Sequence, residues 1–155
     1  MANTVFFSFD YDADWSRMWN IRNSNQFRNN LSDSGEFRRR DRWESVRLKT
    51  DTAIRNWIDE GLKYSIVTVV LISGETWDSR WVKYEIAESE QQRMGMLGIR
   101  VHKMKGMDGY YGTSGPDPFR YADIYKSYPV YDWINDDGYN NINRWVEQAA
   151  ITARR

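Results

Sequence analysis

Two side chains near the middle of the chain are spaced so that they could act together on a small ligand. Trp81 and Glu85 are four residues apart, so in a helix they share one face. That face lies just beside Val82 and Ile86, which we expect to point into the core. A carboxylate next to an indole at the rim of a cleft can hold a planar ligand with partial positive charge. The spacing alone favours a solvated glutamate beside a half-buried tryptophan, and both interpretations stay open.

The strands that must position this pair follow from the hydrophobic pattern. Residues 5–9 (VFFSF) and 66–72 (IVTVVLI) are short and almost continuously apolar. Such runs are typical of a parallel sheet that is covered on both faces. We expect a weaker third strand over 97–102 and a short edge strand over 130–133. Side-chain alternation in the first strand would place Phe6 on the opposite face from its neighbours in sequence.

Helical patterns lie between these runs. Apolar residues recur at helical spacing over 13–31, 50–62, 78–95 and 140–153, and polar residues suited to N-caps precede the second and third of these segments. Alternating strands and helices indicate an α/β fold, with a central parallel sheet and helices on both faces. No repeat or linker is visible, so we expect a single domain over 1–155.

Two segments do not fit this alternation. Residues 32–49 are rich in charge, and we expect a long loop with a short strand around Trp43. The basic residues 38–42 could meet phosphates, but acidic residues interleave with them, which favours a solvated loop. Residues 103–129 contain all three prolines and several glycines, so they are predicted to be irregular surface structure.

Polar side chains follow the predicted strands. Ser8, Asp10 and Tyr11 come at the end of the first strand, and residues 73–76 follow the second. Ligands of open parallel sheets bind beyond the carboxyl ends of the strands, so these segments should converge on a cleft. His102, at the end of the third strand, fits a structural role better than general-base catalysis.

Three acidic residues follow the first predicted strand. Asp10, Asp12 and Asp14 alternate as in a cation-binding loop, but no Gly or Glu follows at the spacing of a calcium site. We therefore interpret them as the rim of the cleft and the cap of the following helix.

Composition excludes several classes of function. The 155 residues include 22 Lys and Arg and 22 Asp and Glu, so the formal net charge is zero, and neither nucleic acid nor a membrane surface is expected as a partner. The absence of cysteine and the single histidine exclude disulfides, thiol catalysis, thiolate zinc sites and multi-histidine metal sites. No apolar run is long enough to cross a membrane and no secretory signal is visible, so we expect a cytoplasmic protein.

Several motifs together resemble a known family. The run SGETWDSRWVKYE resembles the Ser-x-x-Trp-Cys-x-x-Glu region of TIR domains, with Val82 in place of the cysteine, and VFFSF is similar to their first strand. More narrowly, FFSFDYDADW, IRNWIDEGLKYSIVTVVLI, RWVKYEI and GMLGIRVH resemble the TIR-like ThsB proteins of bacterial Thoeris antiphage systems. The resemblance extends over residues 5–103 and implies a flavodoxin-like TIR fold. The Arg-Asp and Pro-Gly pattern of receptor TIR loops is absent from 32–43.

The resemblance implies an enzyme that consumes NAD+, an NAD+ nucleosidase and ADP-ribosyl cyclase, with Glu85 at the position of the catalytic glutamate. NAD+ would be the substrate, and no cofactor would be needed. Breaking the nicotinamide–ribose bond develops oxocarbenium character, which an anion beside the ribose stabilises. The residues expected to bind the substrate are Phe6, Ser8, Asp10, Tyr11, Trp43, Trp77 and Trp81.

A cyclic product of the ADP-ribose type is also implied by the resemblance. Cyclisation requires that a hydroxyl of the folded substrate captures the ribosyl centre in a dry cleft, and the aromatic residues just named suit such a cleft. The product would activate a separate effector protein in antiphage defence. Because several TIR enzymes complete their site by self-association, a homo-oligomer on activation is implied as well.

Two other classes of function remain as alternatives. The first is a non-catalytic TIR module that only assembles with partners. The pairing of Glu85 with Trp81 favours an enzyme over this alternative. The second is a nucleotide-binding domain similar to a phosphoreceiver. Asp10 and Asp12 weakly favour it, but no lysine follows the late strand in a suitable context.

Overall fold

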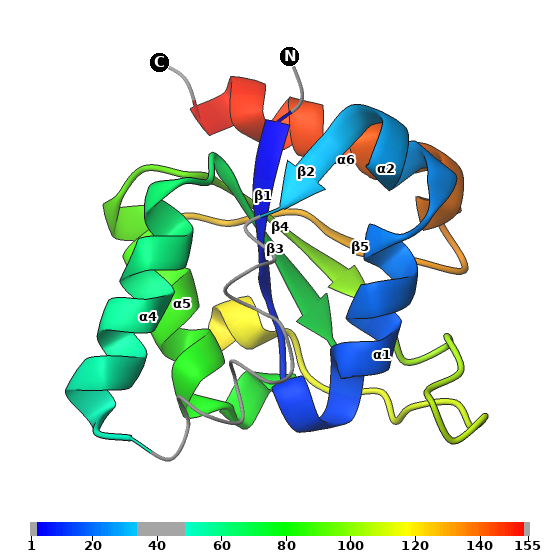
Figure 1. Ribbon diagram of the computed structural model, residues 1–155, viewed down its shortest axis with the longest axis horizontal. Helices are drawn as coiled ribbons and strands as arrows, with labels where there is room; N and C mark the ends of the chain where they lie inside the picture. The colour runs from blue at the N-terminus through cyan, green and yellow to red at the C-terminus, as the bar shows by residue number, and fades with distance from the viewer. Residues whose placement is uncertain (1–2, 34–48, 154–155) are drawn as a thin grey trace.

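The computed structural model describes residues 3–33 and 49–153, and its centre is a parallel β-sheet (Figure 1). Five strands in this part of the chain form the sheet: β1 (Asn3–Ser8), β2 (Leu31–Asp33), β3 (Val67–Ile72), β4 (Gly95–Arg100) and β5 (Val130–Asp132). Their order is β2-β1-β3-β4-β5, and every neighbouring pair is parallel. The predicted α/β fold with a central parallel sheet is therefore confirmed, and the strand order is that of flavodoxin-like folds.

Helices cover both faces of this sheet, as expected. They are α1 (Tyr11–Arg22), α2 (Asn25–Asn30), α4 (Asp51–Lys63), α5 (Arg80–Gln91), α6 (Gly138–Ala153) and the short 3-10 helices η2 (Thr76–Asp78) and η3 (Pro118–Arg120). Side chains of α1, α2 and α6 share one hydrophobic cluster with the sheet, whereas α4 and α5 supply two clusters on the other face. Figure 1 shows α4 and α5 side by side, across the sheet from α1 and α2.

The first strand shows how alternation distributes side chains between these layers. Val5, Phe7 and Phe9 belong to the cluster under α1, α2 and α6, and the Phe7 ring lies 5.4 Å from that of Phe27 in α2. Phe6 belongs to the cluster under α4. The predicted division of the first-strand side chains between the two faces is confirmed.

Polar residues begin the helices at the predicted places. The Thr50 hydroxyl accepts a hydrogen bond of 3.2 Å from the N–H of Ala53, and this cap starts α4. The Ser79 hydroxyl accepts one of 3.3 Å from the N–H of Val82 and starts α5. Asp10 accepts one of 3.4 Å from Ala13, so its predicted role as a cap is confirmed.

The helix predicted over 13–31 is wrong in its second half. The chain breaks at Asn23 and Ser24 into α1 and α2, and the Ser24 hydroxyl donates to the carbonyl of Ile21 (2.7 Å) instead of allowing the helix to continue. The next three residues form β2, whose Leu-Ser-Asp sequence carries no strand pattern. The short strand predicted around Trp43 lies outside the described residues.

The remaining predicted boundaries differ only slightly from those found. The helix predicted to end near Gly95 ends at Gln91, and β4 begins at Gly95. Residues 103–129 are irregular as predicted, apart from η3. In the described residues, no helix has the length and apolar character needed to cross a membrane.

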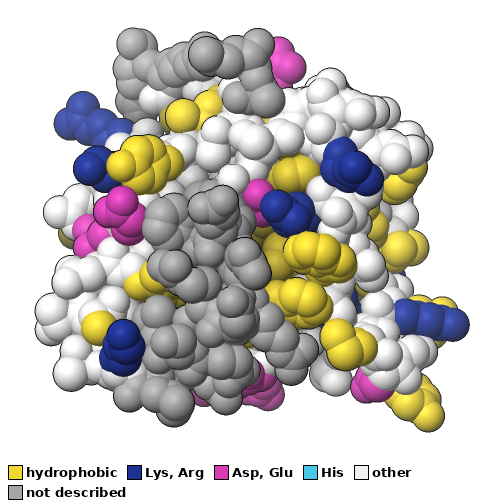
Figure 2. Space-filling view, in the orientation of Figure 1, with side chains coloured by type: hydrophobic (Ala, Val, Ile, Leu, Met, Phe, Trp, Pro, Cys, Tyr) yellow, Lys and Arg dark blue, Asp and Glu magenta, His cyan; other side chains and the backbone are white. Residues whose placement is uncertain are grey.

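Charged side chains are spread over the surface of the molecule. In Figure 2, Lys and Arg lie among Asp and Glu over the described part of the face shown, and neither sign gathers into a large patch there. This distribution matches the balanced composition of 22 basic and 22 acidic residues.

Candidate active site

The carboxyl ends of β1 and β3 meet where the order of the strands reverses. From β1 the chain first adds β2 on one side, and then crosses back to add β3, β4 and β5 on the other. In open α/β sheets this switch point is where ligands bind. Ser8 ends β1 and Ser73 follows β3, so two of the predicted polar segments converge here, as expected.

Glu85 lies at this edge, buried between α5 and the sheet. Its side chain is 1% exposed, and its Oε1 accepts a hydrogen bond of 2.6 Å from the hydroxyl of Ser8, which is also fully buried. The interpretation of Glu85 as a solvated surface glutamate is therefore wrong. Burial of a carboxylate is costly unless hydrogen bonds compensate. A buried, hydrogen-bonded carboxylate at a switch point is a candidate for a functional group.

Two further buried side chains, both with hydroxyl groups, hold the same helix against the sheet. One turn beyond Glu85, the Ser89 hydroxyl donates 2.6 Å to the Glu85 carbonyl and lies 2.7 Å from the hydroxyl of Thr68 in β3. Together with the Ser8 contact, these bonds fix α5 on both β1 and β3. The carboxylate of Glu85 is thus positioned by two strands at once.

Trp81 stands one turn before Glu85 and is half-buried. Its ring packs edge-to-face with that of Tyr84, with the ring centroids 5.9 Å apart, and the guanidinium of Arg80 lies 4.6 Å from the centroid of the Trp81 ring. It also packs against the hydrophobic cluster that contains Phe6. The arrangement leaves an aromatic surface near the carboxylate, and contact of Trp81 with a substrate stays a prediction.

Phe6 shares a face of the sheet with Ser8, as predicted, but its ring is only 1% exposed. It is packed among side chains of α4, including Ile54, Trp57 and Ile58, and holds that helix against β1. A role in substrate binding stays a prediction. The burial of the ring means that its loss must also affect stability.

A buried ion pair in α1 ties together two loops at the same edge, the one after β3 and the one after β4. Asp14, 0% exposed, accepts hydrogen bonds from the hydroxyl of Ser73 (2.5 Å) and from Arg17 (3.0 Å). Arg17 also donates to the carbonyls of Met104 (2.8 Å) and Tyr110 (3.3 Å), so it organises the loop after β4. The interpretation of Asp14 as part of a cleft rim or cap is therefore wrong, because this carboxylate lies inside the protein.

The burial of Asp14 and its hydrogen-bond partners have opposite effects on the pKa of its carboxyl group. Burial raises the pKa of Asp14, while the hydrogen bond from Ser73 and the charge of Arg17 lower it, and the net direction is upward. Nothing in the local sequence predicted the network, because Ser73 is 59 residues away from Asp14.

Comparison with known proteins decides the family. Residues 6–106 match the model of the family described as Thoeris protein ThsB, TIR-like domain. The chain belongs to this ThsB TIR-like family. A curated relative from Bacillus cereus (strain MSX-D12), named "Putative cyclic ADP-D-ribose synthase ThsB1", is 31% identical over an alignment of 192 residues that covers 94% of this chain and 100% of the relative. The family expected from the motifs is confirmed, and with it the flavodoxin-like TIR fold.

All of the predicted site residues fall within the stretch that matches the ThsB TIR-like family. Asp10 is partly exposed and caps α1. Tyr11 is 5% exposed, stacks on Phe9 at 5.4 Å, and borders a cavity of about 260 Å³ between α1 and the 106–108 loop. Trp43 lies outside the described residues.

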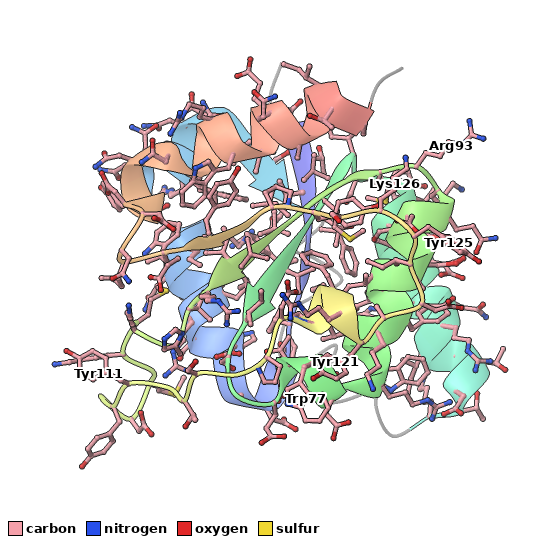
Figure 3. All side chains as sticks on the ribbon, turned by 180° about the vertical axis from the view of Figure 1, so that it is seen from behind. Trp77, Arg93, Tyr111, Tyr121, Tyr125 and Lys126 are labelled. Carbon is pink, nitrogen blue, oxygen red and sulfur yellow. The ribbon has the colours of Figure 1, made fainter. Side chains whose placement is uncertain are left out.

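Trp77 follows β3 and is half-buried in η2. Its ring lies 4.9 Å from that of Tyr121, which comes from the loop after η3 (Figure 3). Tyr121 was not predicted, because it lies beyond the motifs. No cluster of three or more potential metal ligands occurs among residues 3–33 and 49–153.

Proposed function

We propose that this protein cleaves NAD+ to nicotinamide and a cyclic product of the ADP-ribose type, which acts as a signal in antiphage defence. The support comes from two sides. The family is that of the Thoeris protein ThsB, and the Bacillus cereus relative is named as a cyclic ADP-D-ribose synthase. The observation that carries the proposal is the buried Glu85 carboxylate, bonded to Ser8 at the switch point of the sheet.

In this proposal Glu85 stabilises the charge that forms on the ribose. When the bond between C1′ and the nicotinamide nitrogen breaks, its electron pair leaves with nicotinamide, and C1′ acquires oxocarbenium character. A carboxylate held beside the ribose offsets this charge and accepts hydrogen bonds from ribose hydroxyls. A hydroxyl or another nucleophilic atom of the same molecule then bonds to C1′ and loses a proton, so the product is one water lighter than linear ADP-ribose.

Ser8 acts in this scheme by orienting the carboxylate. Its hydroxyl donates a hydrogen bond to one oxygen of Glu85 and so holds the side chain in one rotamer before the substrate arrives. Since Glu85 is 1% exposed, the substrate reaches it only when the side chains that cover it are displaced. The same cover, closed over bound NAD+, would exclude water and so favour cyclisation over hydrolysis.

The proposal extends to partners. The nucleotide product would act on a separate effector protein, and self-association on activation would complete the catalytic site. NAD+ is the substrate in this scheme, and no resident cofactor is invoked.

Incubation of the purified protein with NAD+ tests the proposal directly. Chromatography should show release of nicotinamide, and mass spectrometry should show an equal amount of a product one water lighter than ADP-ribose. Formation of linear ADP-ribose alone, under conditions in which a cyclic standard survives, would contradict the cyclase. No release of nicotinamide, even at concentrations that favour self-association, would instead favour the non-catalytic module.

A further inference from the structure

A second cavity lies at the opposite edge of the sheet, where the strands begin. Its volume is about 350 Å³, within the range of small-molecule sites, and it is enclosed by the end of α5, the start of β4, the segment before β5 and the last turns of α6. Figure 3 shows Arg93 and Lys126, two residues of its lining, far from Trp77 and Tyr121 at the other end of the molecule. The cavity is thus separate from the candidate active site.

The cavity exists because β5 is shorter than its neighbour. β5 starts at Val130, which pairs with Gly98, so the first three residues of β4 have no strand on that side in the described structure. The N–H of Gly95 donates to Ile66 on the β3 side, and that of Gly98 donates to Pro129 on the β5 side. Alternation along the strand therefore turns the N–H of Met96 toward the cavity.

The walls of the cavity are flat and apolar. Tyr131 and Trp145 stack almost parallel, with ring centroids 4.1 Å apart and an interplanar angle of 4°. Met94 and Met96 also belong to the lining, and their side chains pack into the hydrophobic clusters under α4 and α5. This lining suits an aromatic heterocycle, and the N–H of Met96 offers a hydrogen bond to a ring nitrogen.

The mouth of the cavity carries positive charge. The charged residues of its lining are Arg93, Lys126 and Glu90. Both oxygens of Glu90 are engaged, because they accept hydrogen bonds from the N–H groups of Tyr125 (2.8 Å) and Lys126 (3.0 Å) and from the hydroxyl of Tyr128 (2.7 Å). The charge of Lys126 also acts on this carboxylate, so the lining holds two cations against one anion, and a further anion at the mouth can balance the excess positive charge.

We propose that this cavity binds a purine nucleoside monophosphate. The base would lie against Tyr131 with a ring nitrogen on the N–H of Met96, and the phosphate would contact Arg93 and Lys126. A ring without an anion would leave the cations unused, and an inorganic anion would leave the apolar walls in contact with water. The proposal concerns binding alone and does not depend on the NAD+ chemistry of the other edge.

Calorimetric titration of the whole protein with AMP, adenosine and inorganic phosphate tests this site. We expect saturable binding of AMP, weaker binding of adenosine and none of phosphate. The double variant Arg93→Gly/Lys126→Ala should bind AMP at least tenfold more weakly while its affinity for adenosine is unchanged. Arg93 has a φ of 60°, a conformation that glycine adopts easily, so this change should not harm the fold.

Two further variants make the test specific. Lys63→Ala/Arg144→Ala removes the same charge from exposed positions outside the cavity lining and should leave AMP affinity unchanged. Thr152→Trp, at an exposed position of the lining, should block AMP and adenosine alike. Equal AMP affinity of wild type and Arg93→Gly/Lys126→Ala, or no saturable AMP binding, would overturn the proposal. Loss of AMP binding in Glu85→Gln would overturn it too, because the nucleotide would then occupy the other edge.

Discussion

The hydroxyl of Ser8 donates a hydrogen bond of 2.6 Å to the carboxylate of Glu85, and both side chains are buried. The bond joins the last residue of β1 to the middle of α5, across 77 residues of sequence. It brings together the first-strand serine and the helical glutamate of two separate motifs. In the proposed reaction this contact sets where the negative charge stands relative to the ribose.

Removal of the serine hydroxyl should therefore affect activity through Glu85. In Ser8→Ala the carboxylate loses a buried donor, so we expect the free energy of unfolding to fall by about 1–3 kcal/mol. The kcat for nicotinamide release should fall roughly tenfold, because the carboxylate is less well oriented, whereas KM should change less. Urea unfolding and initial rates measure the two effects. An unchanged kcat in folded Ser8→Ala would show that the serine only packs.

Glu85→Gln tests the charge itself. The variant keeps the size of the side chain and removes the anion, so turnover of NAD+ should fall at least about 100-fold, equivalent to ~3 kcal/mol of transition-state stabilisation. Glu147→Gln, at an exposed position of α6, is the matched control and should keep wild-type rates. Near-normal nicotinamide release from folded Glu85→Gln would place the catalysis elsewhere.

The two phenylalanines at the centre of β1 should behave alike in stability. Phe6 and Phe7 are 1% and 2% exposed and pack on opposite faces. Phe6→Ala and Phe7→Ala should each lower the free energy of unfolding by roughly 3–5 kcal/mol. Phe6→Leu separates packing from recognition, because it retains most of the volume but not the ring. If Phe6 contacts the substrate, the leucine variant should lose turnover with little change in its melting curve, and Phe7→Leu should not.

Asp14 should leave a signature in the pH dependence of stability. Burial raises its pKa above the ordinary 3.8, against the opposing effects of Ser73 and Arg17. Between 3.8 and the raised value, the folded protein holds a proton at Asp14 that the unfolded chain has released. The stability from this group is therefore fully present below 3.8 and is lost as pH rises through the folded-state pKa.

Asp14→Asn should lack this component. We expect the free energy of unfolding of wild type, relative to Asp14→Asn, to increase as pH falls from about neutral to about 4. Asp123→Asn, at an exposed position, controls for the general effect of losing a carboxylate. Parallel pH profiles of wild type and Asp14→Asn would mean that the carboxyl of Asp14 titrates as in the unfolded chain.

Local patterns predicted the parts of the structure that depend on neighbours in the chain. The alternation of Phe6 and Phe7 between two faces follows from the pleat of a strand, and the starts of α4 and α5 follow from the capping hydroxyls of Thr50 and Ser79. The break after α1 was missed because it depends on hydrogen bonds from the side chains of Asn23 and Ser24 to backbone carbonyls. β2 was missed because three residues are too few to show a period.

Residue patterns alone predicted the parallel sheet, the positions of most helices, the ThsB-type motifs and Glu85 as a candidate functional residue. Three features depend on long-range packing: the burial of Glu85 on Ser8, the position of Asp14 inside the protein on Ser73, and the cover of α4 over Phe6. Periodicity and capping act over a few residues, so they are visible in the sequence. The partner of a buried polar group is chosen by how strands and helices stack, which no local pattern records.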